Sequence, residues 1–170
     1  MKKIGILSDT HGTLLPSIVK FLEQCDEIWH AGDIGSMEVV NQLREISTLR
    51  AVFGNIDGGN MRAIFNLYEH FMCEEAKVIM THIGGYPGNY DKYVRPILEK
   101  EKPDIFICGH SHILKVIFDK KLKLLHINPG ASGRNGFHKV CTAIRFEVHG
   151  KEFKNLEILE IDRSKLPGLS

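Results

Sequence analysis

Features of disulfide-stabilised, secreted and membrane-spanning proteins are missing from this sequence of 170 residues. Its four cysteines show no CxxC spacing, which argues against a disulfide framework and against a structural zinc site built from thiolates. The cysteines are Cys25, Cys73, Cys108 and Cys141. No apolar run approaches the roughly 20 residues of a membrane span, and Ser8, Asp9 and His11 interrupt the N-terminal apolar stretch too early for a signal peptide. We therefore expect a cytoplasmic protein.

An excess of either charge is also missing. The 22 Lys and Arg residues nearly balance the 21 Asp and Glu residues, so the formal net charge is +1. This balance indicates neither a dedicated groove for duplex nucleic acid nor a polybasic surface for a membrane. The length favours one domain over residues 1–170, in which the last residues, from about residue 163, are expected to fray.

The sequence is rich in histidine, with nine residues, and several of them follow short apolar runs. Residues 4–7 are apolar and partly β-branched, as expected of a strand covered on both faces, and they lead into Asp9 and His11. Further strand exits carry Asp33, Asn55, His82, and the pair His110 and His112. Because the C-terminal ends of parallel strands meet at one edge of a sheet, we expect these exits to converge.

Hydrophobic periodicity predicts strands that alternate with helices over much of the chain. Helices are predicted over residues 17–25, 36–45 and 91–101, with Ser36 as an N-cap and Pro96 able to shorten the last helix. Strands are predicted over residues 27–30, 49–53, 104–108, 113–118, 122–127, 142–148 and 153–161, with two more between residues 66 and 80. Residues 54–59 are expected to form a glycine-rich turn, and residues 86–90 an exposed loop. This arrangement is typical of an α/β fold.

The side chains at the strand exits suit divalent metal ions. Carboxylate and amide oxygens combined with imidazole nitrogens bind Mn²⁺, Fe²⁺ or Zn²⁺. A single residue of this kind is more often a cap or a satisfied polar group, so the prediction rests on the whole set. A carboxylate between two ions can bridge a pair about 3.5–4 Å apart. Without metal, clustered Asp9 and Asp33 are expected to repel each other and raise a pKa.

With this set of residues at its strand exits, the sequence resembles the calcineurin-like metallophosphoesterase superfamily. The resemblance lies in five ordered blocks: Ser8-Asp9-Thr10-His11, Gly32-Asp33, Gly54-Asn55, Thr81-His82 and Gly109-His110-Ser111-His112. More narrowly, the chain is similar to small bacterial and archaeal phosphodiesterases of the YfcE type from residue 4 to about residue 161, including Asn128-Pro129-Gly130. The resemblance implies a two-layer β sandwich flanked by α-helices, in four α/β/β/α layers, with a dinuclear site at one edge.

The resemblance also implies a division of the ligands between two ions. One ion would be held by Asp9, His11, Asp33 and His112, and the other by Asp33, Asn55, His82 and His110. Asp33 would bridge the ions, and Mn²⁺ is the expected metal, although Fe, Ni²⁺ and Zn²⁺ fit the same ligands. Catalysis would involve Asp33, Asn55 and His82 through a metal-bridging hydroxide that attacks the phosphorus, with no protein nucleophile.

One residue departs from the pattern of many relatives. They carry a histidine directly after the residue matching Asn55, where it helps the leaving group depart, whereas this chain has Ile56. The YfcE-type branch also lacks that histidine. Without it, expulsion of a basic alkoxide should be harder, which favours small phosphodiesters with good leaving groups over phosphomonoesters.

Other functions remain open at this stage. A non-catalytic protein-binding scaffold can use the same fold, and a phosphomonoesterase or a nuclease for short oligonucleotides can use the same ligands. The exposed edges of a β sandwich are compatible with a homodimer.

Several other polar residues have a weaker connection with the site. We interpret His30 as structural, Asp57 as either a turn residue or a support for Asn55, and Asn128 as a turn residue before Pro129. His138 has no ligand partner at a suitable spacing.

Overall fold

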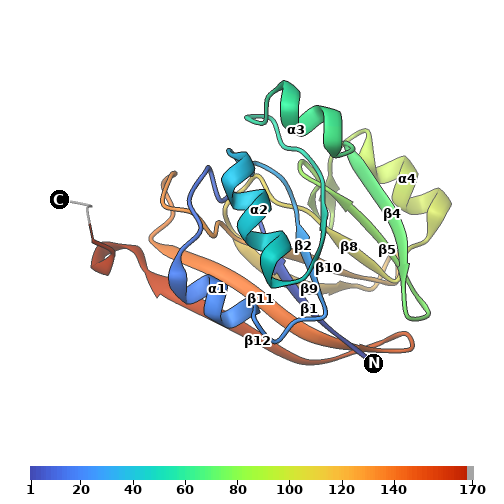
Figure 1. The fold of residues 1–170 in the computed structure, drawn as a ribbon. Helices are drawn as coiled ribbons and strands as arrows, with labels where there is room; N and C mark the ends of the chain where they lie inside the picture. The colour runs from blue at the N-terminus through green and yellow to red at the C-terminus, as the bar shows by residue number, and fades with distance from the viewer. Residues whose placement is uncertain (168–170) are drawn as a thin grey trace.

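Two five-stranded β-sheets form the centre of the computed structural model, which describes residues 1–167 (Figure 1). The first sheet has the order β12-β11-β1-β2-β3, and the second has the order β4-β5-β8-β10-β9. The first sheet contains β1 (Lys2–Leu7), β2 (Glu27–His30), β3 (Thr48–Ala51), β11 (Val140–His149) and β12 (Glu152–Asp162). The second contains β4 (Tyr68–Cys73), β5 (Ala76–Thr81), β8 (Ile105–Ile107), β9 (Leu114–Asp119) and β10 (Leu124–Pro129).

Each sheet contains three neighbouring parallel strands, and its other strands join by antiparallel pairing. In the first sheet β1, β2 and β3 run parallel, and β11 and β12 add antiparallel neighbours. In the second sheet β5, β8 and β10 run parallel between the antiparallel edge strands β4 and β9. The parallel strands therefore bring the loops that follow them to one edge of each sheet.

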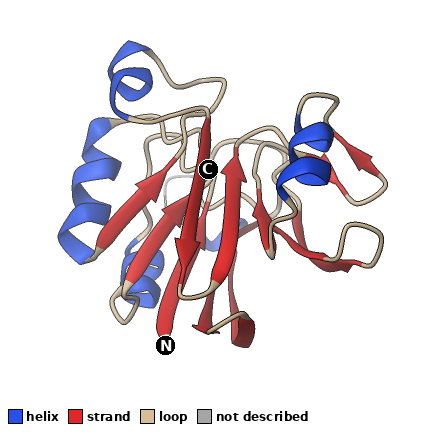
Figure 2. Ribbon diagram, turned by 90° about the vertical axis from the view of Figure 1, so that its right-hand side faces the viewer, coloured by secondary structure: helices blue, strands red, loops and turns tan. Residues whose placement is uncertain are grey.

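Helices cover both outer faces of the sandwich, as the blue ribbons in Figure 2 show. The helices are α1 (Pro16–Leu22), α2 (Met37–Ile46), α3 (Gly59–Ile64) and α4 (Val94–Glu101). Ile4 and Ile6 of β1 pack between the sheets, whereas Leu7 packs in the cluster beneath α1 and α2. A third cluster joins α4 to the outer face of the second sheet. The predicted four-layer sandwich is confirmed, and β1 is covered on both faces as its composition indicates.

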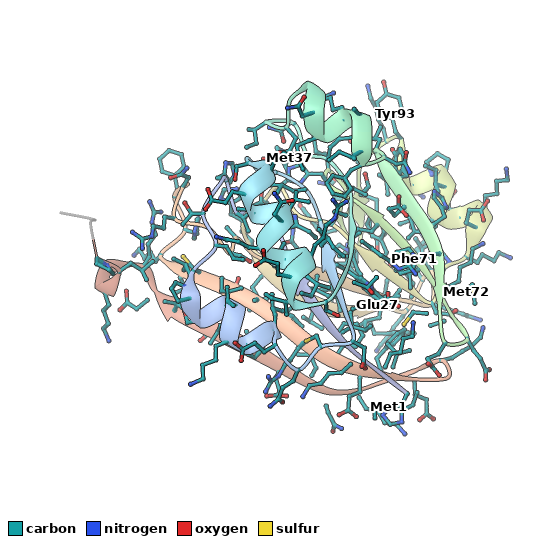
Figure 3. All side chains as sticks on the ribbon, in the orientation of Figure 1. Met1, Glu27, Met37, Phe71, Met72 and Tyr93 are labelled. Atoms are coloured by element: carbon teal, nitrogen blue, oxygen red, sulfur yellow. The ribbon has the colours of Figure 1, made fainter. Side chains whose placement is uncertain are left out.

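A buried carboxylate lies at the end of the sandwich opposite the strand exits. Glu27, at the start of β2, accepts hydrogen bonds from Lys2, from Arg50 at 2.9 Å and from the Trp29 indole at 3.1 Å. Burial alone would raise the pKa of Glu27, but these three donors lower it. The Arg50 guanidinium also lies 4.5 Å from the ring centroid of Phe71 in the other sheet, so this network joins the two layers (Figure 3).

Local elements differ from the prediction at a few places. Helix α3 directly follows the glycine-rich turn, and its six residues are too few to show a helical period in the sequence. The expected loop at 86–90 is instead a small hairpin of β6 (Gly85–Tyr86) and β7 (Asn89–Tyr90). Pro96 does not split α4, because it lies in the first turn, where its missing N–H costs no helical hydrogen bond.

The end of the chain contains one further element. Arg163–Lys165 form the short 3-10 helix η1, and the backbone N–H of Arg163 donates to Lys139 at 3.0 Å. Residues 168–170, at the end of the segment expected to fray, lie outside the described residues. Within residues 1–167, no helix has the length and apolar character needed to cross a bilayer.

Candidate metal centre

All the predicted ligand residues lie together where the parallel strands end. Potential ligand atoms of Asp9, His11 and His112 lie within 4.8 Å of one another, and the same holds for Asp33, His82 and His110. Asn55 adjoins the second group, because its Oδ1 atom lies 3.0 Å from Nδ1 of His110. The strand exits of both sheets therefore converge as their positions in the sequence predict.

Asp33 lies between the two groups. Its Oδ2 atom is 3.7 Å from Nε2 of His11 and 3.2 Å from Nε2 of His82. Asp9 is also close to both groups, with Oδ1 3.1 Å from Nε2 of His112 and 3.8 Å from Nε2 of His82. One carboxylate oxygen of Asp33 thus occupies the position from which it could bridge two ions.

The backbone turns sharply at most of these side chains. Nine non-glycine residues of the described chain have positive φ angles, and five of them are predicted ligands. The five are Asp9, His11, Asp33, His110 and His112. Left-handed backbone is uncommon outside glycine, and its concentration at one site indicates conformations that the surrounding structure imposes for function.

Hydrogen bonds between neighbouring loops hold these turns in place. The backbone N–H of Asp9 donates to Gly32 at 3.0 Å, and that of His11 donates to Asp33 at 3.0 Å. The loops after β1 and β2 therefore continue side by side beyond the sheet. Gly54 permits the loop after β3 to approach them, since a Cβ atom at this position would collide with the Asp33 carboxylate.

The two carboxylates are ionised despite their burial. Burial alone would raise the pKa of Asp9, but the neighbouring imidazoles of His11 and His112 hold that pKa well below its usual range. Burial also opposes ionisation of Asp33, yet His82 and the backbone N–H of Ile56 lower its pKa. Repulsion from Asp9 does raise the pKa of Asp33, as expected, but the surrounding groups outweigh it, so the net pKa shift of each carboxylate is downward.

The carboxylates in turn raise the pKa values of two neighbouring histidines. The nearby Asp9 carboxylate, whose Oδ1 atom lies 3.8 Å from Nε2, raises the pKa of His11. Burial would lower the pKa of His82, but Asp33 and Asp9 raise it. A metal ion bound here would compete with protons for the imidazole nitrogens.

Three buried ligand atoms have no hydrogen-bond partner: Oδ1 of Asp9, Nε2 of His11 and Nε2 of His82. Buried polar atoms are nearly always paired, so three converging exceptions call for a missing partner. His82 donates from Nδ1 to the Ala31 carbonyl at 2.8 Å, which leaves Nε2 available as a ligand. Oxygen and nitrogen ligands around two carboxylates fit a pair of divalent cations.

Buried polar residues behind the ligands fix the loops that carry them. Asp57 accepts hydrogen bonds from the backbone N–H groups of Ile34, Gly35 and Gly54. It therefore supports the loop that carries Asn55, which is one of the two interpretations that the sequence left open. Asn128 does more than stabilise its own turn. It accepts from the Gly130 N–H at 3.0 Å and also donates to the Gly109 carbonyl at 2.9 Å, beside His110.

His30 also contributes to this support. The Gly32 N–H donates to its Nδ1 atom at 3.1 Å, so Nε2 carries the proton and donates to the Thr10 hydroxyl at 2.9 Å. Burial lowers the pKa of His30 to about 4, which keeps the ring neutral. His30 thereby connects the loop before Asp33 with the loop that carries Asp9 and His11.

His138 is a site residue that sequence reasoning missed. Its Nε2 atom donates to the Gly133 carbonyl at 2.8 Å, and its Nδ1 atom lies 3.3 Å from Nδ1 of His112. A neutral His138 therefore accepts a hydrogen bond from the Nδ1–H of His112, which leaves Nε2 of His112 facing Asp9 as a ligand. The two histidines are 26 residues apart in different loops, so no local spacing signals their contact.

Comparison with known proteins finds a matching family, related sequences and similar structures. Residues 1–151 match the calcineurin-like phosphoesterase superfamily domain. A probable metallophosphoesterase from Methanocaldococcus jannaschii is 28% identical over 134 residues, covering 75% of this chain and 67% of that protein. Vps29 from Chaetomium thermophilum has a similar structure, with a TM-score of 0.75 at 15% identity over 95% of this chain and 97% of that chain. An archaeal phosphodiesterase gives a TM-score of 0.70 at 23% identity over 92% of this chain and 99% of that chain.

The orientation of His112 by His138 leads to a prediction about metal affinity. We expect His138→Ala to weaken binding of one Mn²⁺ ion about tenfold to 100-fold, because His112 loses the partner that fixes its tautomer. His138→Asn should retain most of the affinity, since its side-chain oxygen can accept the same hydrogen bond. Calorimetric titration of metal-stripped protein with Mn²⁺ measures both effects.

The matched control is His70→Ala, which removes an exposed histidine on β4. Equal Mn²⁺ affinities for the wild type and for the alanine and asparagine variants of His138 would show that His138 does not orient a ligand.

Proposed function

The chain belongs to the calcineurin-like phosphoesterase superfamily, and from this premise we propose that it is a metal-dependent phosphodiesterase acting on a small phosphodiester. The observation that carries the proposal is the set of buried ligand atoms of Asp9, His11 and His82, which converge without partners. A protein that kept only the fold would not need to maintain these unsatisfied atoms at a cost to its stability.

The proposed ligand sets follow the two groups in the structure. Asp9, His11 and His112 would hold one ion, and Asn55, His82 and His110 the other, with Asp33 shared between them. A bound pair of divalent cations supplies an activated water near neutral pH and neutralises charge on the phosphoryl oxygens. Mn²⁺ is our first choice of metal because these oxygen and nitrogen ligands suit it, and Fe, Ni²⁺ and Zn²⁺ suit the same set.

The chain's own residues position these components rather than react with the substrate. Ser8 donates to the Gly32 carbonyl at 3.3 Å, and Ser111 interacts with Asn128 at 3.0 Å, so neither hydroxyl has a basic partner to activate it. The buried supports Asp57 and His30 hold the ligand loops before any substrate arrives. Catalysis in this proposal depends on preorganised charge and on no protein nucleophile.

Ile56 favours a diester over a monoester as the substrate. Its backbone N–H donates to Oδ1 of Asp33 at 3.0 Å, while its side chain is 47% exposed and has no acidic proton to give. A leaving group that departs without a proton must be a weak base, so an aryl or otherwise stabilised oxygen is favoured.

A second candidate function is that of a protein-binding scaffold, the role we consider because Vps29 has the same fold. Edge strand β9 gives this alternative a specific observation: Val116, Ile117 and Phe118 are 36%, 46% and 56% exposed. An exposed apolar edge strand is suited to pairing with another chain. The two functions would use different residues, since Val116, Ile117 and Phe118 belong to neither ligand cluster.

The proposed activity is tested with bis(p-nitrophenyl) phosphate. Protein treated with chelator should be inactive and should regain turnover with Mn²⁺. Asp33→Asn should lower kcat about 100-fold or more, because it removes the shared negative charge. Absence of turnover by folded protein with every first-row divalent ion, or full activity in Asp33→Asn, would refute the diesterase.

Ile56→His tests the account of leaving-group preference. The new imidazole should speed hydrolysis of a diester with an alkoxide leaving group about 100-fold by general acid catalysis, with little effect on the p-nitrophenyl ester. Ile56→Asn is the matched control, since it is polar but transfers no proton near neutral pH. If both variants change the two rates equally, proton donation at this position is not what limits alkoxide departure.

A further inference from the structure

A cavity of about 780 Å³ opens beside His110, one of the proposed metal ligands. Its floor is the outer face of the second sheet, where Lys115 of β9 pairs with Asn128 of β10 and His126 lies two residues before Asn128. The β6–β7 hairpin forms the opposite wall with Tyr86 and Tyr90. The cavity therefore extends from the candidate metal centre along the sheet.

The hairpin wall is tied to the floor at two points. The Tyr90 hydroxyl donates to Oδ2 of Asp119 at 2.9 Å, at the far end of β9. The Lys115 ammonium lies 4.4 Å from the ring centroid of Tyr86, so a cation and an aromatic ring face the same space. Ile113, in the loop before β9, adds an apolar surface on the same side of the cavity.

His126 is the unusual residue of this cavity. It is fully buried in β10, and neither of its ring nitrogens has a hydrogen-bond partner. The rings of Tyr90 and Phe106 lie on either side, each with its centroid 5.8 Å from that of His126. Burial lowers the pKa of His126 to about 4, so the neutral ring presents one donor and one acceptor. Leaving both unpaired is costly unless a bound molecule satisfies them.

We propose that this cavity binds the base of a nucleoside carried by the phosphodiester substrate. The inference rests on the proposed function and adds the class of substrate. A base offers a flat face for Tyr86 and a polar edge that can pair with the His126 nitrogens once the Tyr90 ring beside them moves aside, and Lys115 favours a ligand that carries negative charge. An alkyl or acyl chain would leave the His126 nitrogens without partners. The volume is sufficient for a nucleoside next to the phosphate.

A second cavity also borders the ligands but offers less to a base. It has a volume of about 350 Å³ and includes Asn55, His82 and Tyr93 among its lining residues. Arg62 in this cavity already donates to the Asp57 carbonyl at 2.8 Å and covers the Phe53 ring, so its polar group is partnered. Tyr93 projects from the surface and is 67% exposed (Figure 3). Tyr93 therefore provides a matched control for Tyr86.

The test compares two ligands that differ only in the base. We expect Mn²⁺-loaded protein to bind adenosine 5′-monophosphate about tenfold or more tightly than ribose 5-phosphate in a calorimetric titration. Tyr86→Ala and His126→Phe should each remove most of that difference, the second because phenylalanine keeps the ring but loses both nitrogens. Tyr93→Ala should leave the difference unchanged. Inorganic phosphate should bind equally to all four proteins.

The outcomes separate this inference from the proposed function. Equal affinity for the two ligands, in protein that still binds inorganic phosphate in a Mn²⁺-dependent manner, would overturn the base subsite and leave the phosphodiesterase intact. Loss of the preference in Tyr93→Ala but not in Tyr86→Ala would place the base in the other cavity and also overturn the inference. Failure to bind inorganic phosphate with Mn²⁺ present would instead count against the proposed function itself.

Discussion

Two buried carboxylates, Asp9 and Asp33, lie within reach of the same histidines, and the structure around the strand exits depends on keeping both ionised. Their negative charges are tolerated because imidazoles and backbone N–H groups surround them. Left-handed turns at the ligand residues and the close approach of Gly54 to Asp33 bring these groups together. The sandwich supplies the rigidity, since its parallel strands end where these loops begin.

The α/β class and the clustering of the candidate ligands were predictable from local sequence, whereas the four-layer sandwich followed from the resemblance to the superfamily. Each ligand comes directly after an apolar strand, and the order of strands and helices identifies an α/β architecture. His138 and His126 were not predictable in this way. Their importance depends on contacts that tertiary structure creates, one with His112 from a distant loop and one with a cavity wall. Helix α3 was not predicted because its six residues are too few to show a helical period in the sequence.

The distinction between an enzyme and a scaffold depends on the site, since the fold serves both. Structural likeness to Vps29 and to an archaeal phosphodiesterase is similar in extent, and it carries no information on which role this chain has. The ligand clusters and the cavity that adjoins them provide the chemical argument. A base subsite next to a pair of metal ions would make the chain selective as well as reactive, through residues on the hairpin and the second sheet.

The central claim is that two metal ions share Asp33, and anomalous X-ray diffraction from crystals of Mn²⁺-loaded protein tests it most directly. The account predicts two manganese peaks about 3.5–4 Å apart, with the Asp33 carboxylate between them. One peak should lie beside Asp9 and His112, and the other beside Asn55 and His82. A single peak, or peaks away from these residues, would contradict the claim.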